Sequence, residues 1–148
     1  VITNLEWGAI AYLTNSSYGD FNINSTTGNV TGVYQMASSL KEMVMANYNQ
    51  DAGKNKEDNS GFQNYGIVSW PNVIDYYNGI TSKNRILGDA TGETEGWYQS
   101  EHNFVNGEEP FMVRGGTMNQ ITSIYNFDHN TGNYHEDVTF RTCILSEN

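Results

Sequence analysis

The first apolar block of the chain has the spacing of an amphipathic helix. Thr3 and Glu6 stand three residues apart, as in a capping box, which predicts that a helix begins at Thr3. Residues 15–20 have turn chemistry, which predicts that this helix ends near Thr14. The apolar helix face that the spacing predicts consists of Leu5, Ala9, Tyr12 and Leu13.

Short apolar segments then alternate with long polar ones. Residues 33–45 are the most apolar part of the first half, and they predict short strands or extended core segments. Residues 47–64 and 78–96 are polar and predict surface segments. The pairs at 97–98 and 104–105 are expected to anchor loops to the body of the protein. The methionines expected to fill the core are Met36, Met43 and Met45.

Three strand candidates follow in the C-terminal third, at residues 110–114, 124–127 and 138–145. The segments between them, 117–123 and 128–137, are polar. Short strands that frame long polar loops predict an α+β fold. We expect a small, mostly antiparallel sheet with one or two helices and long display loops.

Composition narrows the possible partners. The 148 residues suit one domain, and an aromatic content of 13% argues against disorder. The net charge is −10, from 17 acidic and 7 basic residues, and such a surface repels nucleic acid and anionic lipid. The sequence has no apolar run of 18 residues, so direct membrane insertion is not expected.

Four motifs, met in order along the chain, resemble formylglycine-generating-enzyme-like domains. They stand at residues 4–9, 31–44, 111–116 (with Arg-Gly-Gly) and 139–141 (Thr-Phe-Arg). A closer resemblance, to bacterial surface proteins that carry this fold, covers residues 6–13, 26–36, 88–98 and 114–141. The same C-type-lectin fold carries the variable proteins of diversity-generating retroelements. In those proteins a loop-rich face between the RGG and FR motifs varies while the scaffold is held.

The resemblance implies a single C-type-lectin-like domain over residues 1–148. It also implies that an N-terminal strand and helix precede this region in typical members and are lacking here. The function that it implies is ligand binding at the cell surface or outside the cell, as an adhesin or receptor-binding module. The ligand would be a protein or a glycan on another cell or surface.

The binding face is expected between residues 117 and 137. Tyrosine gives rigid contact area there, and Asn, Ser and Thr give short hydrogen-bonding groups. Residues expected to belong to the scaffold are Ile124, Phe127, Val138 and Phe140. The candidate contacts are Thr117, Asn119, Gln120, Thr122, Asp128, His129, Asn130, Asn133, Tyr134, His135 and Glu136.

Active diversification of this face is left open by the sequence. Adenine-directed variation of AAC or AAT codons yields Asn, Tyr, Ser, Thr, Asp or His. It does not yield Met118, Gln120 or Glu136. Those positions are therefore fixed in the template, encoded otherwise, or signs that this chain is not varied.

Catalysis is not expected. Formylglycine-generating enzymes hold copper with a pair of cysteines, whereas this chain has only Cys143, which is read as a small buried hydrophobe. Related iron-dependent enzymes use three histidines, but His102, His129 and His135 lack the i, i+4 spacing of a metal pair.

No cofactor is expected, and calcium is the one alternative. Residues 89–95 place oxygen ligands at alternate positions, but the spacing of glycine and terminal glutamate that an EF-hand requires is absent. An acidic turn is the preferred interpretation. The remaining rival function is a structural pilus or cell-wall module, which a hydrophobic display face would favour.

Overall fold

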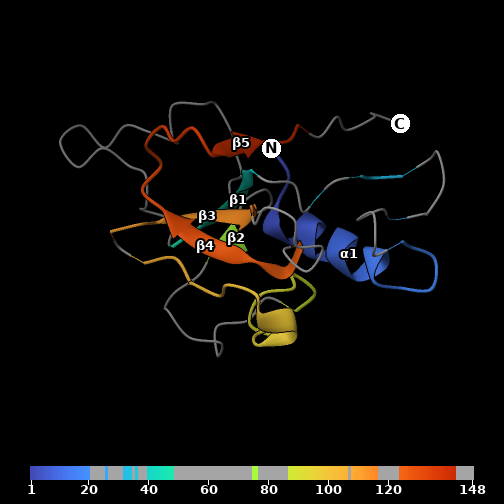
Figure 1. Ribbon diagram of the computed structural model, residues 1–148. Helices are drawn as coiled ribbons and strands as arrows, with labels where there is room; N and C mark the ends of the chain where they lie inside the picture. Colours follow the sequence, from blue (N-terminus) through green and yellow to red (C-terminus); the bar gives the residue numbers. More distant parts are fainter. Residues whose placement is uncertain are drawn as a thin grey trace.

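In the computed structural model the chain has an α+β fold, with one α-helix beside a small sheet (Figure 1). The elements are α1 (Asn4–Thr14), β1 (Lys41–Asn47), β2 (Asp75–Tyr76), the 3-10 helix η4 (Trp97–Gln99), β3 (Phe111–Gly115), β4 (Phe127–Asn130) and β5 (Val138–Phe140). The structure describes residues 1–20, 26, 32–34, 36, 40–48, 75–76, 87–106, 108–116 and 124–142.

The helix begins where the sequence predicts. Thr3 is the N-cap, its backbone N–H donates to Oε2 of Glu6 at 2.8 Å, and the Glu6 N–H donates to Oγ1 of Thr3 at 3.1 Å. The helix ends at Thr14, which confirms both predicted boundaries.

The predicted apolar face of this helix is wrong. Leu5, Ala9 and Leu13 are exposed, and Tyr12 is half-buried. The face that packs inward consists of Asn4, Trp7, Gly8, Ala11 and Thr14. Two polar residues and a glycine lie on this inner face, so a count of apolar positions at helical spacing selected the neighbouring face.

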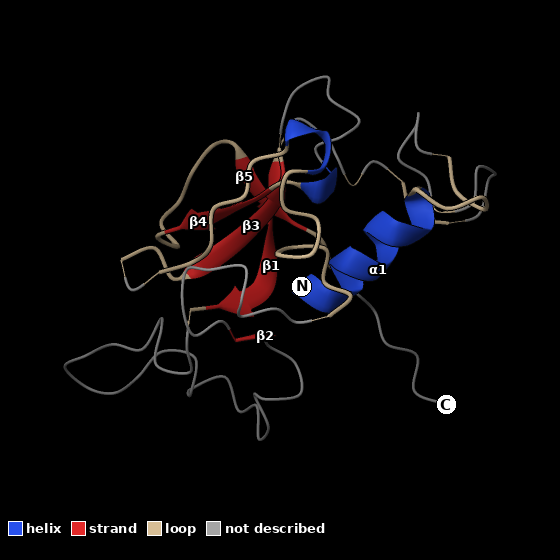
Figure 2. Ribbon diagram, turned by 90° about the horizontal axis from the view of Figure 1, so that it is seen from below, coloured by secondary structure: helices blue, strands red, loops and turns tan. Residues whose placement is uncertain are grey.

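The sheet is mixed, and β1 is its central strand. β1 pairs antiparallel with β3, which pairs antiparallel with β4. The residues of β1 that pair in parallel with β5 are Lys41 to Met43, and those that pair in parallel with β2 are Ala46 and Asn47. The two parallel strands therefore take opposite ends of β1, where the sequence predicted a mostly antiparallel sheet. Seen from below, α1 lies to one side of this sheet (Figure 2).

Several strand boundaries differ from the predictions. β3 confirms the candidate at 110–114, and β1 confirms a strand in the second half of 33–45. The candidate at 124–127 is wrong in its boundaries, because residues 124–125 form a helical turn and the strand runs from Phe127 to Asn130. β5 begins at Val138 as predicted, and residues 143–145 of that candidate, including Cys143, lie outside the described residues.

The core lies between α1, the inner face of the sheet and the segment that enters β4. Trp7 is fully buried, and its Nε1 donates to the carbonyl oxygen of Ile124 at 2.8 Å. Met36 is fully buried, as predicted, whereas Met43 and Met45 are half-buried. Other fully buried apolar side chains are Ala11, Ala90, Val105, Met112, Ile124, Tyr125 and Phe127.

A buried arginine joins three of these parts. Arg114 on β3 is fully buried, and its guanidinium lies 5.7 Å from the ring centroid of Trp7 and 5.8 Å from that of Phe127. It donates to Oδ1 of Asn4 at 2.6 Å. It also donates to the carbonyl oxygens of Asp89, Ala90 and Asn126 at 2.9, 2.9 and 3.0 Å.

A second arginine ties β5 to β1. Arg141 donates from Nε and Nη2 to the carboxylate of Glu42, at 3.0 and 2.7 Å, in a bidentate pair. Glu42 is buried on β1. The arginines of both the RGG and the Thr-Phe-Arg motifs are therefore parts of the framework.

Within the described ranges, no helix has the length and apolar character needed to span a bilayer.

Candidate functional site

The candidate contacts fall into three groups. Thr117, Asn119, Gln120 and Thr122 lie outside the described residues. Asp128, His129 and Asn130 lie on β4, and Asn133, Tyr134, His135 and Glu136 lie in the connection from β4 to β5. We call residues 131–137 the β4–β5 loop.

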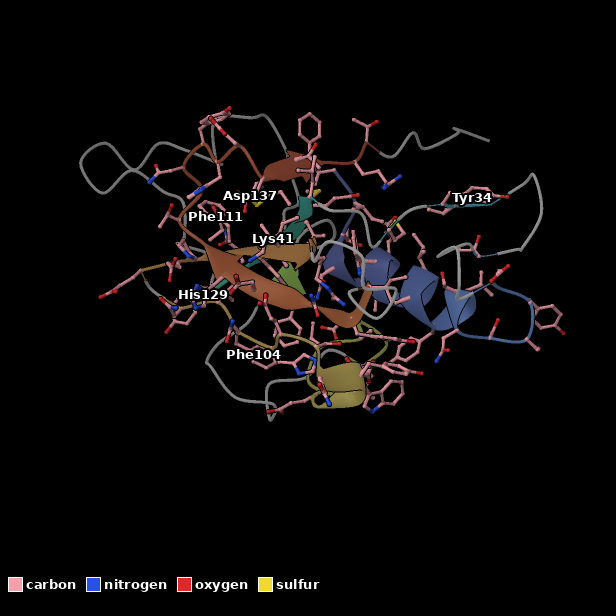
Figure 3. All side chains as sticks on the ribbon, viewed as in Figure 1. Tyr34, Lys41, Phe104, Phe111, His129 and Asp137 are labelled. Atoms are coloured by element: carbon pink, nitrogen blue, oxygen red, sulfur yellow. The ribbon has the colours of Figure 1, made fainter. Side chains whose placement is uncertain are left out.

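The side chain of Asp128 is held by internal partners. Its Oδ2 accepts a hydrogen bond from Nζ of Lys41 at 2.5 Å, and its Oδ1 accepts one from Nδ2 of Asn103 at 3.1 Å. Burial alone would raise the pKa of Asp128, but the hydrogen bond and charge of Lys41, together with Asn103 and the His129 N–H, hold it below its usual value. Lys41 and His129 are labelled over the sheet in Figure 3.

The two other β4 candidates also have partners within the fold. Nδ1 of His129 lies 2.7 Å from Oε2 of Glu109, on the segment that leads into β3. Asn130 is nearly buried, and its Oδ1 accepts the Gly132 N–H at 2.7 Å, which closes an Asx-type turn. The side chains of His129 and Asn130 therefore make contacts within the fold, directly before residues 131–137.

The β4–β5 loop itself faces solvent. Every residue from Thr131 to Asp137 is exposed, and Tyr134 is 88% exposed. Both ends are fixed, by the turn at Asn130 and by the hydrogen bond from the Lys41 N–H to the carbonyl oxygen of Asp137 at 2.9 Å. The loop is a short exposed segment on a rigid base.

The expected scaffold residues behave unequally. Ile124 and Phe127 are fully buried, which fits a scaffold role. Val138 is half-buried and Phe140 is 62% exposed; both lie on β5, and their assignment to the scaffold stays a prediction. β5 pairs with only one end of β1, and the described elements leave the ring of Phe140 uncovered.

A second surface, outside the predicted binding face, lies at Trp97 and Tyr98. These residues are 42% and 47% exposed, whereas Phe104 and Val105, the other expected anchor pair, are buried. Trp97 and Tyr98 rest on Tyr12 of α1 and on the buried Tyr125. We call Tyr12, Trp97, Tyr98 and Tyr125 the aromatic platform. Two adjacent aromatic residues after Gly96, in a polar segment, were the available signal.

The acidic segment 89–95 is a turn with internal hydrogen bonds. Oδ1 of Asp89 accepts from the N–H and the Oγ1 of Thr91, at 2.9 and 2.6 Å. Oε1 of Glu93 accepts from the hydroxyl of Tyr12 at 2.6 Å and from the Gly88 and Ala90 N–H groups at 2.9 and 3.2 Å. Oδ1 of Asp89 and Oε1 of Glu93 are therefore used in hydrogen bonds that form the turn and hold the Tyr12 hydroxyl.

The three histidines lie in different settings. His129 contacts Glu109, His135 lies 3.9 Å from Asp137, and His102 packs on Phe127 with ring centroids 5.1 Å apart. Over the described part of the chain, no three His, Cys, Asp or Glu side chains come together as a metal-binding group.

No protein-family model matches the chain, and no curated protein or solved structure matches it.

Proposed function

We propose that this chain is a non-enzymatic, extracellular ligand-binding module with a C-type-lectin-like fold. Its recognition surface would be the β4–β5 loop together with residues 117–123. The ligand would be a protein or a glycan on another cell or surface. The observation that carries the proposal is the continuous exposure of residues 131–137 between two fixed ends.

The chemistry of the loop suits recognition. Tyr134 offers a large ring with only two side-chain torsions to immobilise, so contact through it costs little conformational entropy. Asn133, His135 and Glu136 are exposed beside it and offer hydrogen-bond donors and acceptors. A polar, aromatic-centred surface of this kind fits an adaptable binding face better than the apolar core of a permanent subunit interface.

The framework is separated from this surface. Arg114 and Arg141 lie on either side of the loop in sequence, and their hydrogen bonds go to buried or half-buried partners. Substitution within residues 131–137 therefore leaves these contacts in place. This separation supports a module in which loop residues vary while the fold is kept.

The proposal is tested by nucleotide sequencing of the gene across its native population. We expect substitutions to concentrate in codons 117–137 and to spare Arg114 and Arg141. In parallel, alanine at all four of Asn133, Tyr134, His135 and Glu136 should change the melting temperature by less than about 4 °C. Flat variation along the gene, or collapse of the fold in the quadruple variant, would contradict a variable recognition loop.

A further inference from the structure

The aromatic platform is an exposed and rigid surface that the proposed function does not use. The ring of Trp97 stands edge-on to Tyr125, with centroids 5.6 Å apart and planes at 66°. It also stands edge-on to Tyr12, at 6.4 Å and 80°. The ring of Tyr98 stacks on Tyr125, at 5.7 Å and 20°. Trp97 and Tyr98 therefore pack on Tyr12 and Tyr125, and the two upper residues are 42% and 47% exposed.

The rings below are held in place from beneath. The hydroxyl of Tyr12 donates to Glu93, and burial together with that carboxylate raises the pKa of Tyr12 well above its ordinary value. Burial likewise raises the pKa of Tyr125. Both tyrosines therefore stay neutral, and neither introduces charge under the platform.

The backbone is arranged to present the two upper rings. Gly96, Tyr98 and Gln99 have φ of 83°, 54° and 60°, so two consecutive non-glycine residues adopt the left-handed region. Side chains disfavour this conformation, and it persists only where surrounding contacts hold it. Here the Gly96 N–H donates to Nδ1 of His102 at 3.1 Å, and Oγ of Ser100 donates to the Trp97 carbonyl at 2.8 Å. These hydrogen bonds hold the strained turn, and the turn carries the exposed side chains of Trp97 and Tyr98.

The surroundings of the platform select the class of ligand. Nδ2 of Asn15 lies 3.4 Å from the hydroxyl of Tyr98, and Glu95 and Gln99, which flank residues 96–98 in the sequence, are exposed. Among the described residues, the three Lys and Arg side chains are all held elsewhere: Lys41 by Asp128, Arg114 in the core and Arg141 by Glu42. The two exposed rings are inclined to each other, because the plane of Tyr98 lies 20° from that of Tyr125 and the plane of Trp97 lies 66° from it. Each ring can pack on the apolar C–H face of one pyranose ring, and the Asn15 amide can meet the hydroxyl rim. Phosphate, sulfate and nucleic acid are opposed by the net charge of −10.

We propose that the aromatic platform binds a neutral oligosaccharide, whose neighbouring sugar rings pack on Trp97 and Tyr98. The amide of Asn15, beside the Tyr98 hydroxyl, hydrogen-bonds its hydroxyl groups. η4, which carries the two rings, is drawn in yellow below β4 in Figure 1, whereas β5 lies above β4 in that view. The site uses none of the residues of the β4–β5 loop, so saccharide binding here can be tested independently of the function proposed above.

The test is binding of the whole chain to an array of neutral oligosaccharides of glucose, galactose, mannose and N-acetylglucosamine, with sialylated and sulfated glycans as anionic comparisons. The strongest neutral binder is then titrated by calorimetry. We expect Trp97→Ala and Tyr98→Ala each to weaken binding by about tenfold or more, because stacked aromatic residues dominate such contacts. Tyr18→Ala is the matched control, since it removes a tyrosine that is 78% exposed and belongs to neither surface, and it should bind as the parent does. Tyr134→Ala is made alongside it, because loss of binding there would assign the saccharide to the β4–β5 loop.

A measurement on the unaltered protein covers the case in which a platform variant fails to fold. In titration by two-dimensional NMR, the indole N–H signal of Trp97 should shift with the saccharide, while that of the buried Trp7 should not. Three results would overturn the proposal: no neutral oligosaccharide bound, binding lost in Tyr134→Ala but kept in both platform variants, or association of the chain with itself through Trp97 in place of saccharide binding.

Discussion

At the residue scale, the least expected feature is the number of charges inside the fold. Arg114 is fully buried and Glu42 nearly so, although charged side chains are rarely buried unless they have partners. Each is satisfied by several hydrogen bonds, from helix, loop and strand in one case and from a second arginine in the other. The two motif arginines therefore stabilise the fold.

Replacement of Arg114 by lysine tests this role. Lysine keeps the charge but cannot reach four acceptors at once, so carbonyl oxygens are left buried without donors. We expect Arg114→Lys to lower the free energy of unfolding by about 3 kcal/mol or more, measured by urea denaturation. Arg141→Lys is the matched control and should cost about 1 kcal/mol, because Arg141 is partly exposed and one contact to Glu42 can survive. Equal losses would show that burial of Arg114 is not what matters.

The pair of Lys41 and Asp128 predicts a dependence on acid. The pKa of Asp128 lies below its ordinary value of 3.8 in the folded state, so its contribution to stability is present above that value and is lost as pH falls through the folded pKa. Lys41 has its pKa raised above 10.5, so its contribution is lost only in strong alkali. From pH 7 to pH 2, Asp128→Asn should therefore lose less stability in urea denaturation than the parent protein. The exposed control Glu136→Gln should follow the parent.

At the element scale, the sequence predicts the helix start and a strand correctly, but it does not predict which face of the helix is buried. The capping box at Thr3 and the strand at 111–115 depend on neighbours in sequence, and both are where the sequence placed them. The inner face of α1 was missed because it is lined by Asn4, Gly8 and Thr14. Asn4 is buried against Arg114, and Gly8 is buried against the loop at 88–89. No pattern of apolar positions contains that information.

The same reason accounts for the errors at the candidate site. β4 is polar at Asp128 and His129 and was read as a loop, because its pairing with β3 and its contacts to Lys41 and Glu109 come from distant segments. The sequence predicts that Trp97 and Tyr98 anchor a loop, and both do pack on Tyr12 and Tyr125. Their exposed fractions of 42% and 47% were not predicted, because aromatic residues are usually buried.

Gly8 gives the sharpest test of how α1 packs. A Cβ at this position would lie 2.2 Å from the carbonyl oxygen of Gly88 and 2.3 Å from the carbonyl carbon of Asp89, so only glycine admits the loop this close. Alanine favours a helix over glycine by about 1 kcal/mol, yet we expect Gly8→Ala to destabilise the protein by about 2 kcal/mol. The reverse change at the exposed neighbour, Ala9→Gly, should cost about 1 kcal/mol through helix propensity alone. A gain in melting temperature for Gly8→Ala would mean that helix and loop are not in contact.

At the scale of the whole molecule, two effects of charge oppose each other. The described ion pairs stabilise particular contacts, Lys41 with Asp128 and Arg141 with Glu42, and both pairs are at least partly shielded from solvent. The net charge of −10 instead acts over the entire surface, because 17 acidic residues repel one another around only 7 basic ones. Salt screens exposed charges far more than shielded pairs, so it weakens the repulsion more than the pairs.

We therefore expect this protein to become more stable with added salt. Raising NaCl from 0.01 to 0.2 M shortens the screening length from about 30 Å to below about 10 Å, which removes most of the long-range repulsion between surface carboxylates. The melting temperature should rise by several degrees over this interval at pH 7. Asp128→Asn, which loses the pair with Lys41 and one negative charge, should show a similar rise if repulsion dominates. A fall in melting temperature for the parent but not for Asp128→Asn would instead assign the electrostatic stability of the fold to its ion pairs.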